Sequence, residues 1–205
     1  MGFFSKALGS ADGDVLANGI LGRGQITGIS VSGMTVRVSN SLVERKCTIS
    51  MNVLIDHTPM FQATVVQRIR EVYLPQLAQN AVVAVRVDPA DHGKVFIDFA
   101  SRVPVVTLPR NTDENSASHI LEHGRPVKVV LVANQPLNLK NADGIDLQML
   151  TLTVYEGVDA PYQIQVGNPV PATALPLLYP GSKLHAMLGA APGNVVVKWS
   201  AGAAN

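Results

Sequence analysis

Cysteine is nearly absent from this sequence: Cys47 is the only one among 205 residues. A single cysteine cannot form an internal disulfide, and a zinc site of four cysteines, or of two cysteines and two histidines, is excluded as well. Cys47 falls in an alternating apolar run, so we expect a small buried core residue rather than a reactive thiol. Nothing in this cysteine usage requires an oxidising compartment.

Charged and aromatic residues are also scarce. Charged residues make up 15% of the chain and aromatic residues 5%, and the formal net charge is +1. Such a balanced chain offers no broad positive field to a phosphate backbone, and its few rings offer few platforms for base stacking. These two shortages argue against general nucleic-acid binding.

Long apolar runs are missing too. No stretch of about 18 apolar residues occurs, so the sequence predicts no transmembrane helix. The first ten residues carry one lysine and are soon interrupted by polar residues, which is not typical of a secretory signal. A frayed tail or packing arm is one interpretation of this segment. The other is a docking peg for a protein partner or a membrane surface, formed by Phe3, Phe4 and Leu8.

The sequence does contain an internal repeat. Leu74-Pro75-x-Leu77 recurs as Leu175-Pro176-x-Leu178, and Gly93-x-Val95-x-Ile97-x-Phe99 recurs as Gly193-x-Val195-x-Val197-x-Trp199. The two matches keep the same order, at offsets of 101 (175 − 74) and 100 (193 − 93). Near the start of each half we align Ile20-Leu21-x-x-Gly24 with Ile120-Leu121-x-x-Gly124. The repeat predicts two tandem copies of one module.

The repeat and the composition together predict the domain boundaries. We predict an N-terminal tail at residues 1–13, a first module at 14–100, a linker at 101–117, a second module at 118–200 and a tail at 201–205. In the linker, the apolar residues 103–109 should pack against a domain, and the polar residues 110–116 should be flexible. Each module opens with a short helical signal, capped by Asp14 in the first copy and by Asn115 or Ser116 in the second.

Alternating apolar and polar residues predict the strands. Such alternation occupies residues 34–38, 47–55 and 150–154, and turn residues at 56–59 and 156–161 predict hairpins. Each Leu-Pro-x-Leu segment predicts one helical turn at the end of a sheet, because proline prevents a long helix. Asn80 and Gly181 should then turn the chain into the last two strands.

Five or six short antiparallel strands must hide one apolar face, and they do so by curling into a small barrel. We therefore predict an all-β fold with short helices, built as two tandem small antiparallel β-barrels. A helix before the last two strands favours an OB-like order. An SH3-like barrel and a small sandwich stay open as alternatives.

The end of the first module, residues 79–99, resembles small uncharacterised bacterial β-modules. Their pattern of alternating valines, Asp-Pro, then Val-x-Ile-Asp is matched here by residues 82–87, by Asp88-Pro89 and by residues 95–98. The second module departs from it, with Gly189-Ala190 and Lys198 at the corresponding positions. The resemblance implies a bacterial β-barrel module without known chemistry. Some members of that group lie beside membrane segments, so we expect a cytoplasmic protein, with peripheral membrane association as the alternative.

The sharpest chemical motif is His119-Ile-Leu-Glu-His123, the spacing of inverted zinc proteases. That chemistry needs a stable helix, but Gly124 and Pro126 interrupt the helix at once. We therefore expect both histidines on the outer face, without a metal. Asp88 to His92 is rich in carboxylates, but aspartates in a turn usually accept hydrogen bonds from their own backbone.

These observations favour a protein that is not an enzyme and has no cofactor and no metal site. We predict an interaction or structural module that binds a protein partner or assembles into a larger complex. The alternatives are a peripheral membrane accessory protein and an OB-like nucleic-acid binder. For the nucleic-acid binder, a local patch on the first module would have four basic residues: Arg68, Arg70, Arg86 and Lys94.

Overall fold

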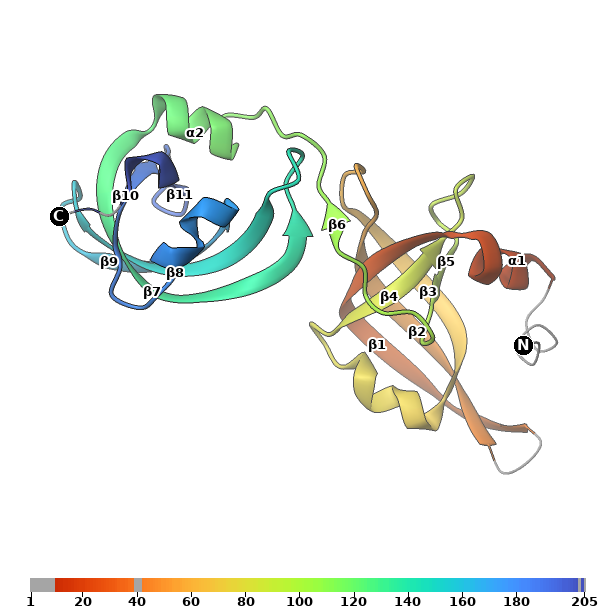
Figure 1. The fold of residues 1–205 in the computed structure, drawn as a ribbon. Coiled ribbons are helices and arrows are strands. Elements are labelled where there is room, and N and C mark those ends of the chain that lie inside the picture. Colours follow the sequence, from red (N-terminus) through yellow and green to blue (C-terminus); the bar gives the residue numbers. More distant parts are fainter. Residues whose placement is uncertain (1–9, 39–41, 203, 205) are drawn as a thin grey trace. The chain divides into compact units, whose positions relative to one another are not determined.

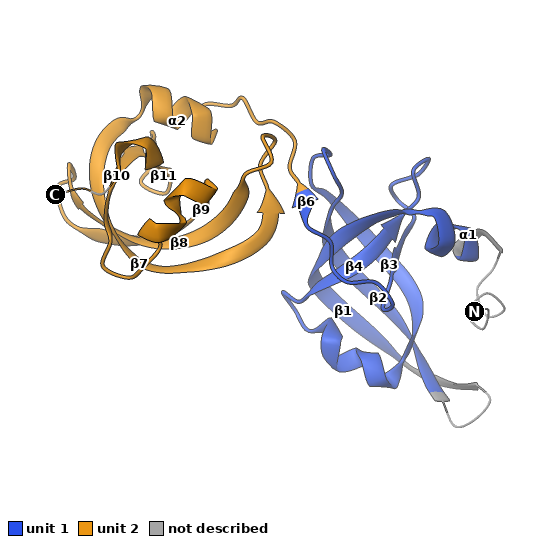
Figure 2. Cartoon of the chain, viewed as in Figure 1, with its two compact units in different colours: residues 1–106 blue, residues 107–205 orange. Residues whose placement is uncertain are grey.

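The computed structural model describes residues 10–38, 42–202 and 204. It divides into two compact units, residues 1–106 and 107–205 (Figure 2). Antiparallel strands dominate both units and the helices are short (Figure 1), which confirms the predicted fold class. Phe3, Phe4 and Leu8 lie outside the described residues, so their docking role stays a prediction.

Unit 1 is a single curled sheet with the strand order β3-β2-β1-β4-β5. Helix α1 (Ser10–Asn18) precedes the first strand. A short helix, η1, lies between the third strand and the last two strands. The elements after α1 are β1 (Ile20–Val38), β2 (Leu42–Leu54), β3 (Phe61–Arg70), η1 (Glu71–Leu77), β4 (Val82–Val87) and β5 (Val95–Ile97).

Unit 2 repeats this order as β11-β10-β7-β8-β9, read from the opposite end, and adds the two-residue strand β6 beside β7. Its elements are β6 (Val106–Thr107), α2 (Ala117–His123), β7 (Arg125–Lys140), β8 (Asp146–Glu156), β9 (Tyr162–Pro169), η2 (Ala172–Leu177), β10 (Lys183–Leu188) and β11 (Val195–Val197). A last short helix, η3, spans Trp199–Ala201. Two halves with the same strand order are what the repeat predicts.

The opening of each module corrects the predicted repeat alignment. Residues 20–24 belong to strand β1, whereas Ile120 and Leu121 lie in helix α2. The buried Val15 of α1 is the counterpart of Ile120, at an offset of 105 (120 − 15). A helix-closing glycine follows four residues later in both units, where its N–H bonds to the carbonyl of that apolar residue. The predicted pairing of Ile20-Leu21 with Ile120-Leu121 was therefore wrong.

Both cores follow the predicted alternation. In unit 1 the inward residues of β2, Cys47 among them, are fully buried and pack against β3, β4 and β5. The pKa of the Cys47 thiol is raised by burial, as expected for a core residue rather than a reactive one. In unit 2, Leu150, Leu152 and Val154 take the equivalent places on β8.

The predicted turns and helical plugs are present. Asn80 and Gly181 both adopt a positive φ, of 67° and 92°, and lead into β4 and β10. The Leu-Pro-x-Leu segments form the 3-10 helices η1 and η2, and Leu77 of η1 is buried in the core. Helix α1 begins at Ser10, four residues before the expected Asp14 cap.

Both halves of the linker make contacts with the fold. Val106 is buried and β6 pairs with β7, which agrees with an apolar half that packs against a domain. In the polar half, whose flexibility stays a prediction, Arg110 forms an ion pair with Asp143, and Asn115 accepts a hydrogen bond from the Asn194 side chain at 2.6 Å.

One side-chain amide joins the two ends of each sheet. β3 and β5 are the two edge strands of the sheet in unit 1, and β9 and β11 are those in unit 2. These four strands are fully described, and no backbone ladder links β3 to β5 or β9 to β11. In unit 1, Gln67 of β3 donates to the Ile97 carbonyl at 3.2 Å and accepts from the Ile97 N–H at 2.9 Å. In unit 2, the fully buried Asn168 of β9 donates to the Val195 carbonyl at 3.1 Å and accepts from the Val197 N–H at 2.8 Å. We call this contact the amide clasp.

Candidate functional site

The outer face of β2 and β3 is the first candidate surface, and strand register builds it. Because inward and outward residues alternate, the buried Cys47 and Ile49 place Lys46 and Thr48 on the outside. Register then aligns Lys46 with Arg68 and Thr48 with Val66, and the rows continue through Ser50–Thr64 and Asn52–Gln62 in one direction and through Glu44–Arg70 in the other. These ten residues form what we call the outer face of unit 1.

Two positive charges stand directly opposite each other on this face. Lys46 and Arg68 are exposed cross-strand partners, and no described carboxylate forms an ion pair with either. Like charges directly opposite on an antiparallel pair destabilise the sheet. The row beside this pair holds Glu44 opposite Arg70, and the rest of the outer face consists of hydroxyl and amide side chains and Val66, with no aromatic ring.

The same row has a different chemistry in unit 2. Leu147 and Pro169 pair where unit 1 has Lys46 and Arg68, each at an offset of 101 (147 − 46 and 169 − 68). Two rows away the polar character is shared, because Gln165 donates to the Thr151 hydroxyl at 3.4 Å. The two modules therefore keep one framework and present different surfaces.

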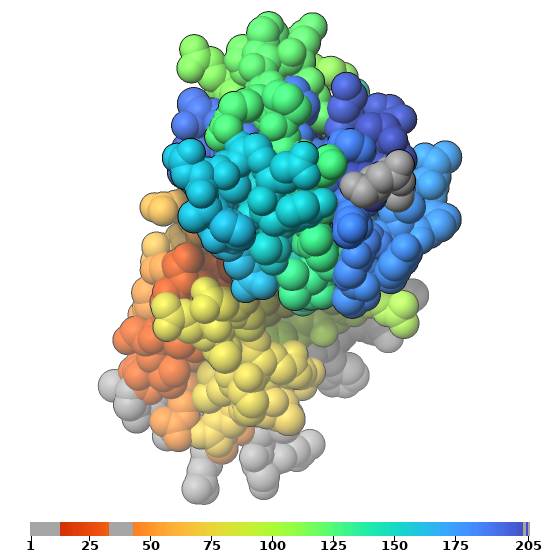
Figure 3. All heavy atoms as spheres, turned by 90° about the vertical axis from the view of Figure 1, so that its left-hand side faces the viewer, coloured from red at the N-terminus to blue at the C-terminus, as the bar shows by residue number. Residues whose placement is uncertain are grey.

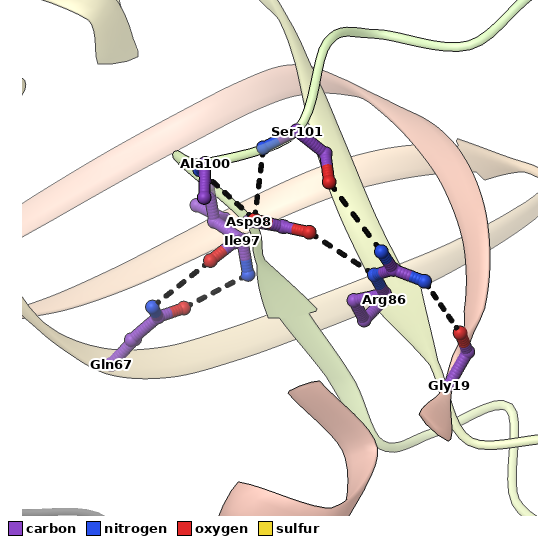
Figure 4. A network of polar contacts seen from close by, with 7 residues as sticks. All are labelled: Gly19, Gln67, Arg86, Ile97, Asp98, Ala100 and Ser101. Carbon is purple, nitrogen blue, oxygen red and sulfur yellow. Dashed lines mark hydrogen bonds and ion pairs between the residues drawn. The ribbon is translucent and has the colours of Figure 1, made fainter. Parts of the chain in front are cut away.

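The predicted basic patch of four residues does not form as a unit. Arg86 is half-buried and donates to Asp98 at 3.1 Å, to the Gly19 carbonyl at 3.1 Å and to Ser101 at 3.4 Å (Figure 4). Lys94 forms ion pairs with Asp88 and Asp91. Of the four residues, Arg68 and Arg70 lie on the outer face, and Lys46 stands there opposite Arg68.

Asp98 is the titratable group most strongly held in this network (Figure 4). Burial acts to raise the pKa of Asp98, but hydrogen bonds from Ser101, Arg86 and the backbone of Ala100 outweigh it, so the pKa is lowered overall. The network ties β4, the end of β5 and the start of β1 together. We interpret the network as structural, because its polar groups form hydrogen bonds within the protein.

A hollow beside α2 is the second candidate. It has a volume of about 320 Å³ and is lined by α2, including His119 and His123, and by the turn after β10. In the space-filling view α2 (green) lies against the blue C-terminal segments (Figure 3), and α2 contacts both β10 and β11. The rings of His119 and His123 stack, with centroids 4.4 Å apart.

The two histidines of the motif differ in exposure. Glu122 and His123 are exposed, as expected for the outer face of a short helix, whereas His119 is half-buried. In the described part of the chain, no group of three or more His, Cys, Asp or Glu side chains is arranged to hold a metal ion.

The loop between β4 and β5 behaves as predicted from its sequence. Asp88 accepts from the N–H of Ala90 at 2.8 Å and Asp91 accepts from the N–H of Gly93 at 3.0 Å, so both carboxylates bond to their own backbone. His92 of this loop stacks on Phe61 at a centroid distance of 5.2 Å. In unit 2 the equivalent ring, Tyr162, donates its hydroxyl to the Pro192 carbonyl at 3.1 Å. The loop therefore covers an end of the barrel in both units.

No protein-family model, curated protein or solved structure matches this chain. The resemblance to small bacterial β-modules therefore stays a prediction. Among the described residues, no helix combines the length and the hydrophobicity needed to span a bilayer.

Proposed function

We propose that this chain is a non-catalytic interaction protein, built from two OB-like modules with different binding surfaces. A five-stranded barrel in the order β3-β2-β1-β4-β5, with a short helix before the last two strands, supports the OB-like assignment. OB folds bind their ligands on the face of strands 2 and 3. The outer face of unit 1 is that surface.

The observation that carries the proposal is the opposed pair of Lys46 and Arg68. Such a pair costs stability in the free protein, and an anionic group lying across both strands removes that cost. The hydroxyl and amide side chains in the neighbouring rows provide further hydrogen-bond donors. We infer that the ligand is an acidic segment of a protein partner.

The test uses native affinity purification and mass spectrometry with the full chain as bait. The wild type is compared with Lys46→Glu/Arg68→Glu and with a charge-matched control in unit 2, Lys183→Glu/Lys198→Glu, at two exposed lysines. We expect a protein that the wild type and the control recover and that the outer-face variant loses. Recovery of the same proteins by all three baits, or of none by the wild type, contradicts the proposal.

Nucleic-acid binding is the second candidate, because the same two cations lie where OB folds hold oligonucleotides. The missing aromatic rings on this face argue for an acidic peptide instead, since single-strand binding relies on base stacking. Fluorescence anisotropy with single-stranded oligonucleotides at low salt separates the two. Binding at micromolar protein that disappears in Lys46→Glu/Arg68→Glu would replace the acidic peptide by a nucleic acid.

A further inference from the structure

The second half of strand β1 has a free edge. β1 pairs with β4 from Ile20 to Gln25, and Ile26 exchanges backbone hydrogen bonds with Asn80 and Ala81. From Gly28 to Val31 the strand pairs with β2 on one side, and no described residue pairs with it on the other. Alternate residues of an antiparallel strand direct their N–H and C=O groups to each side. Residues 28–31, which we call the β1 edge, therefore present unpaired backbone groups.

The side chains on this edge are unusually apolar for a free strand. Ile29 and Val31 are 37% and 42% exposed, whereas their cross-strand partners Ile49 and Cys47 are fully buried. The β1 edge contains no charged residue and no proline. Natural proteins protect free edges with charges, prolines or a covering segment, because a bare apolar edge pairs with other strands.

Strand β7 of unit 2 differs from the β1 edge in two ways. The counterparts of residues 28–31, at an offset of 105 (136 − 31), are residues 133–136 of β7, and they include Asn134 and Pro136. Proline has no N–H to offer to an added strand. Further along, β6 pairs with β7, and the Leu108 N–H bonds to the Lys140 carbonyl at 2.8 Å. In unit 2 a short added strand therefore pairs with β7.

We propose that a second copy of this chain covers the β1 edge, with the two edges pairing antiparallel about a twofold axis. A twofold contact places the same patch on both subunits, so the patch must complement itself. The β1 edge meets this requirement, because it is uncharged and its β-branched Ile29 and Val31 can pack against the same residues of the other copy. The pairing continues the sheet of unit 1 through both copies.

This inference extends the proposed function to self-assembly, and the two can fail separately. The outer face depends on Lys46 and Arg68, whereas the dimer depends on Ile29 and Val31. A dimer that binds no acidic partner would support the edge contact and contradict the proposed function. A monomer that binds an acidic partner would do the reverse.

Sedimentation velocity of the full chain over a range of concentrations tests the dimer. We expect a wild-type dimer that Ile29→Lys and Val31→Lys each weaken at least tenfold, because each variant places two lysines, one from each copy, in the apolar contact between the edges. Asn134→Lys, at the position of unit 2 equivalent to Ile29, is the matched control and should leave the dimer intact. Circular dichroism melts show whether each variant folds.

A wild-type protein that stays monomeric up to about 100 μM overturns the proposal, because its dissociation constant would then exceed this concentration. A dimer that survives both lysine variants also overturns it. If a lysine variant does not fold, a spin label at Ser30→Cys in a Cys47→Ala background gives a second measurement. Paired strands lie about 5 Å apart, so strong dipolar broadening between copies is expected there and none for a label at Gln165→Cys. Equal spectra for the two labels contradict the twofold edge.

Discussion

The two units wind the same strand order around different cores. Unit 1 has Gly22 and Gly24 on the inner side of β1, where unit 2 has Val127 and Val129 at the equivalent register. At the first position the opposite strand compensates, because Val85 faces Gly22 whereas Ala186 faces Val127. At the second position it does not, because Val83 faces Gly24 whereas the larger Leu184 faces Val129. The comparison shows that the same register and alternation accommodate different core residues in the two units, and that compensation across the ladder is local.

Some polar contacts occur in both units, and others occur in one unit only. The amide clasp occurs in both units, at residues 101 positions apart (168 − 67), although one clasp is glutamine and the other asparagine. The Arg86–Asp98 network is private to unit 1, since Met187 and Lys198 stand at the equivalent positions. The clasp therefore belongs to the framework, and the charge network is an addition to one copy.

Exchanging one core residue without its partner should have the largest effect. In Gly22→Val the new Cβ would stand 2.7 Å from the Leu54 carbonyl oxygen and 2.6 Å from the Ile55 side chain. Overpacking of this kind costs about 3 kcal/mol, although valine is the native residue at the equivalent position of unit 2. Trp199, the only tryptophan, reports on unit 2. We expect an earlier unfolding transition by circular dichroism and an unchanged one by tryptophan fluorescence; an equal shift in both would contradict separate cores.

Breaking the clasp should have the next largest effect, and more in unit 2 than in unit 1. Asn168→Ala leaves a buried carbonyl and a buried N–H of β11 without partners, which costs about 2 kcal/mol. Gln67→Ala should cost less, since Gln67 is only half-buried and water can reach the freed groups. Urea unfolding measures both, with the exposed Gln163→Ala as control. A clasp variant no less stable than this control would contradict a role in closing the barrel.

Low pH should destabilise unit 1 more than unit 2, because of Asp98. Its pKa is lowered in the folded state, so it binds fewer protons there than in the unfolded chain. Its contribution is therefore present above the unfolded value of about 4 and is lost as the pH falls through the folded pKa. Asp98→Asn should lower the stability of unit 1 by about 1 kcal/mol at pH 7 and flatten its dependence on pH below about 4. Denaturation curves at several pH values test this, and an unchanged slope in the variant would count against the network.

The smallest effect concerns the outer face. Lys46→Glu replaces a repulsive pair with Arg68 by an attractive one, which should raise the stability of unit 1 by a few tenths of a kcal/mol, roughly 0.5. Thr151→Glu in unit 2 is the control, because it faces a neutral glutamine. Thermal melts at low salt measure both. A destabilised Lys46→Glu variant would show that the two cations do not oppose each other in the free protein.

Features encoded by short local patterns were the ones the sequence could predict. Asn80 and Gly181 were recognised as turn residues because positive φ favours these residue types. The repeat alignment failed at Ile20 because an apolar pair followed by glycine fits a strand as well as a helix. Lys46 was missed because its opposition to Arg68 depends on strand register, which composition does not reveal.

The amide clasp left a weaker signal that could have been found. Gln67 and Asn168 obey the repeat offset, but they are not identical, and an isolated amide in a strand normally indicates a solvent-exposed position. Its partner strand lies about 30 residues away. Only the curvature of the sheet brings the two strands together.

Backbone hydrogen exchange at Ile97 and Val197, followed by NMR, tests most directly whether the amide clasp joins the edge strands in both units. Each N–H donates to an amide side chain of its own unit, to Gln67 and to Asn168 respectively. Both should exchange slowly in the wild type. Gln67→Ala should release Ile97 alone, and Asn168→Ala should release Val197 alone. Fast exchange of either N–H in the wild type, or protection that survives loss of its amide, would contradict the account.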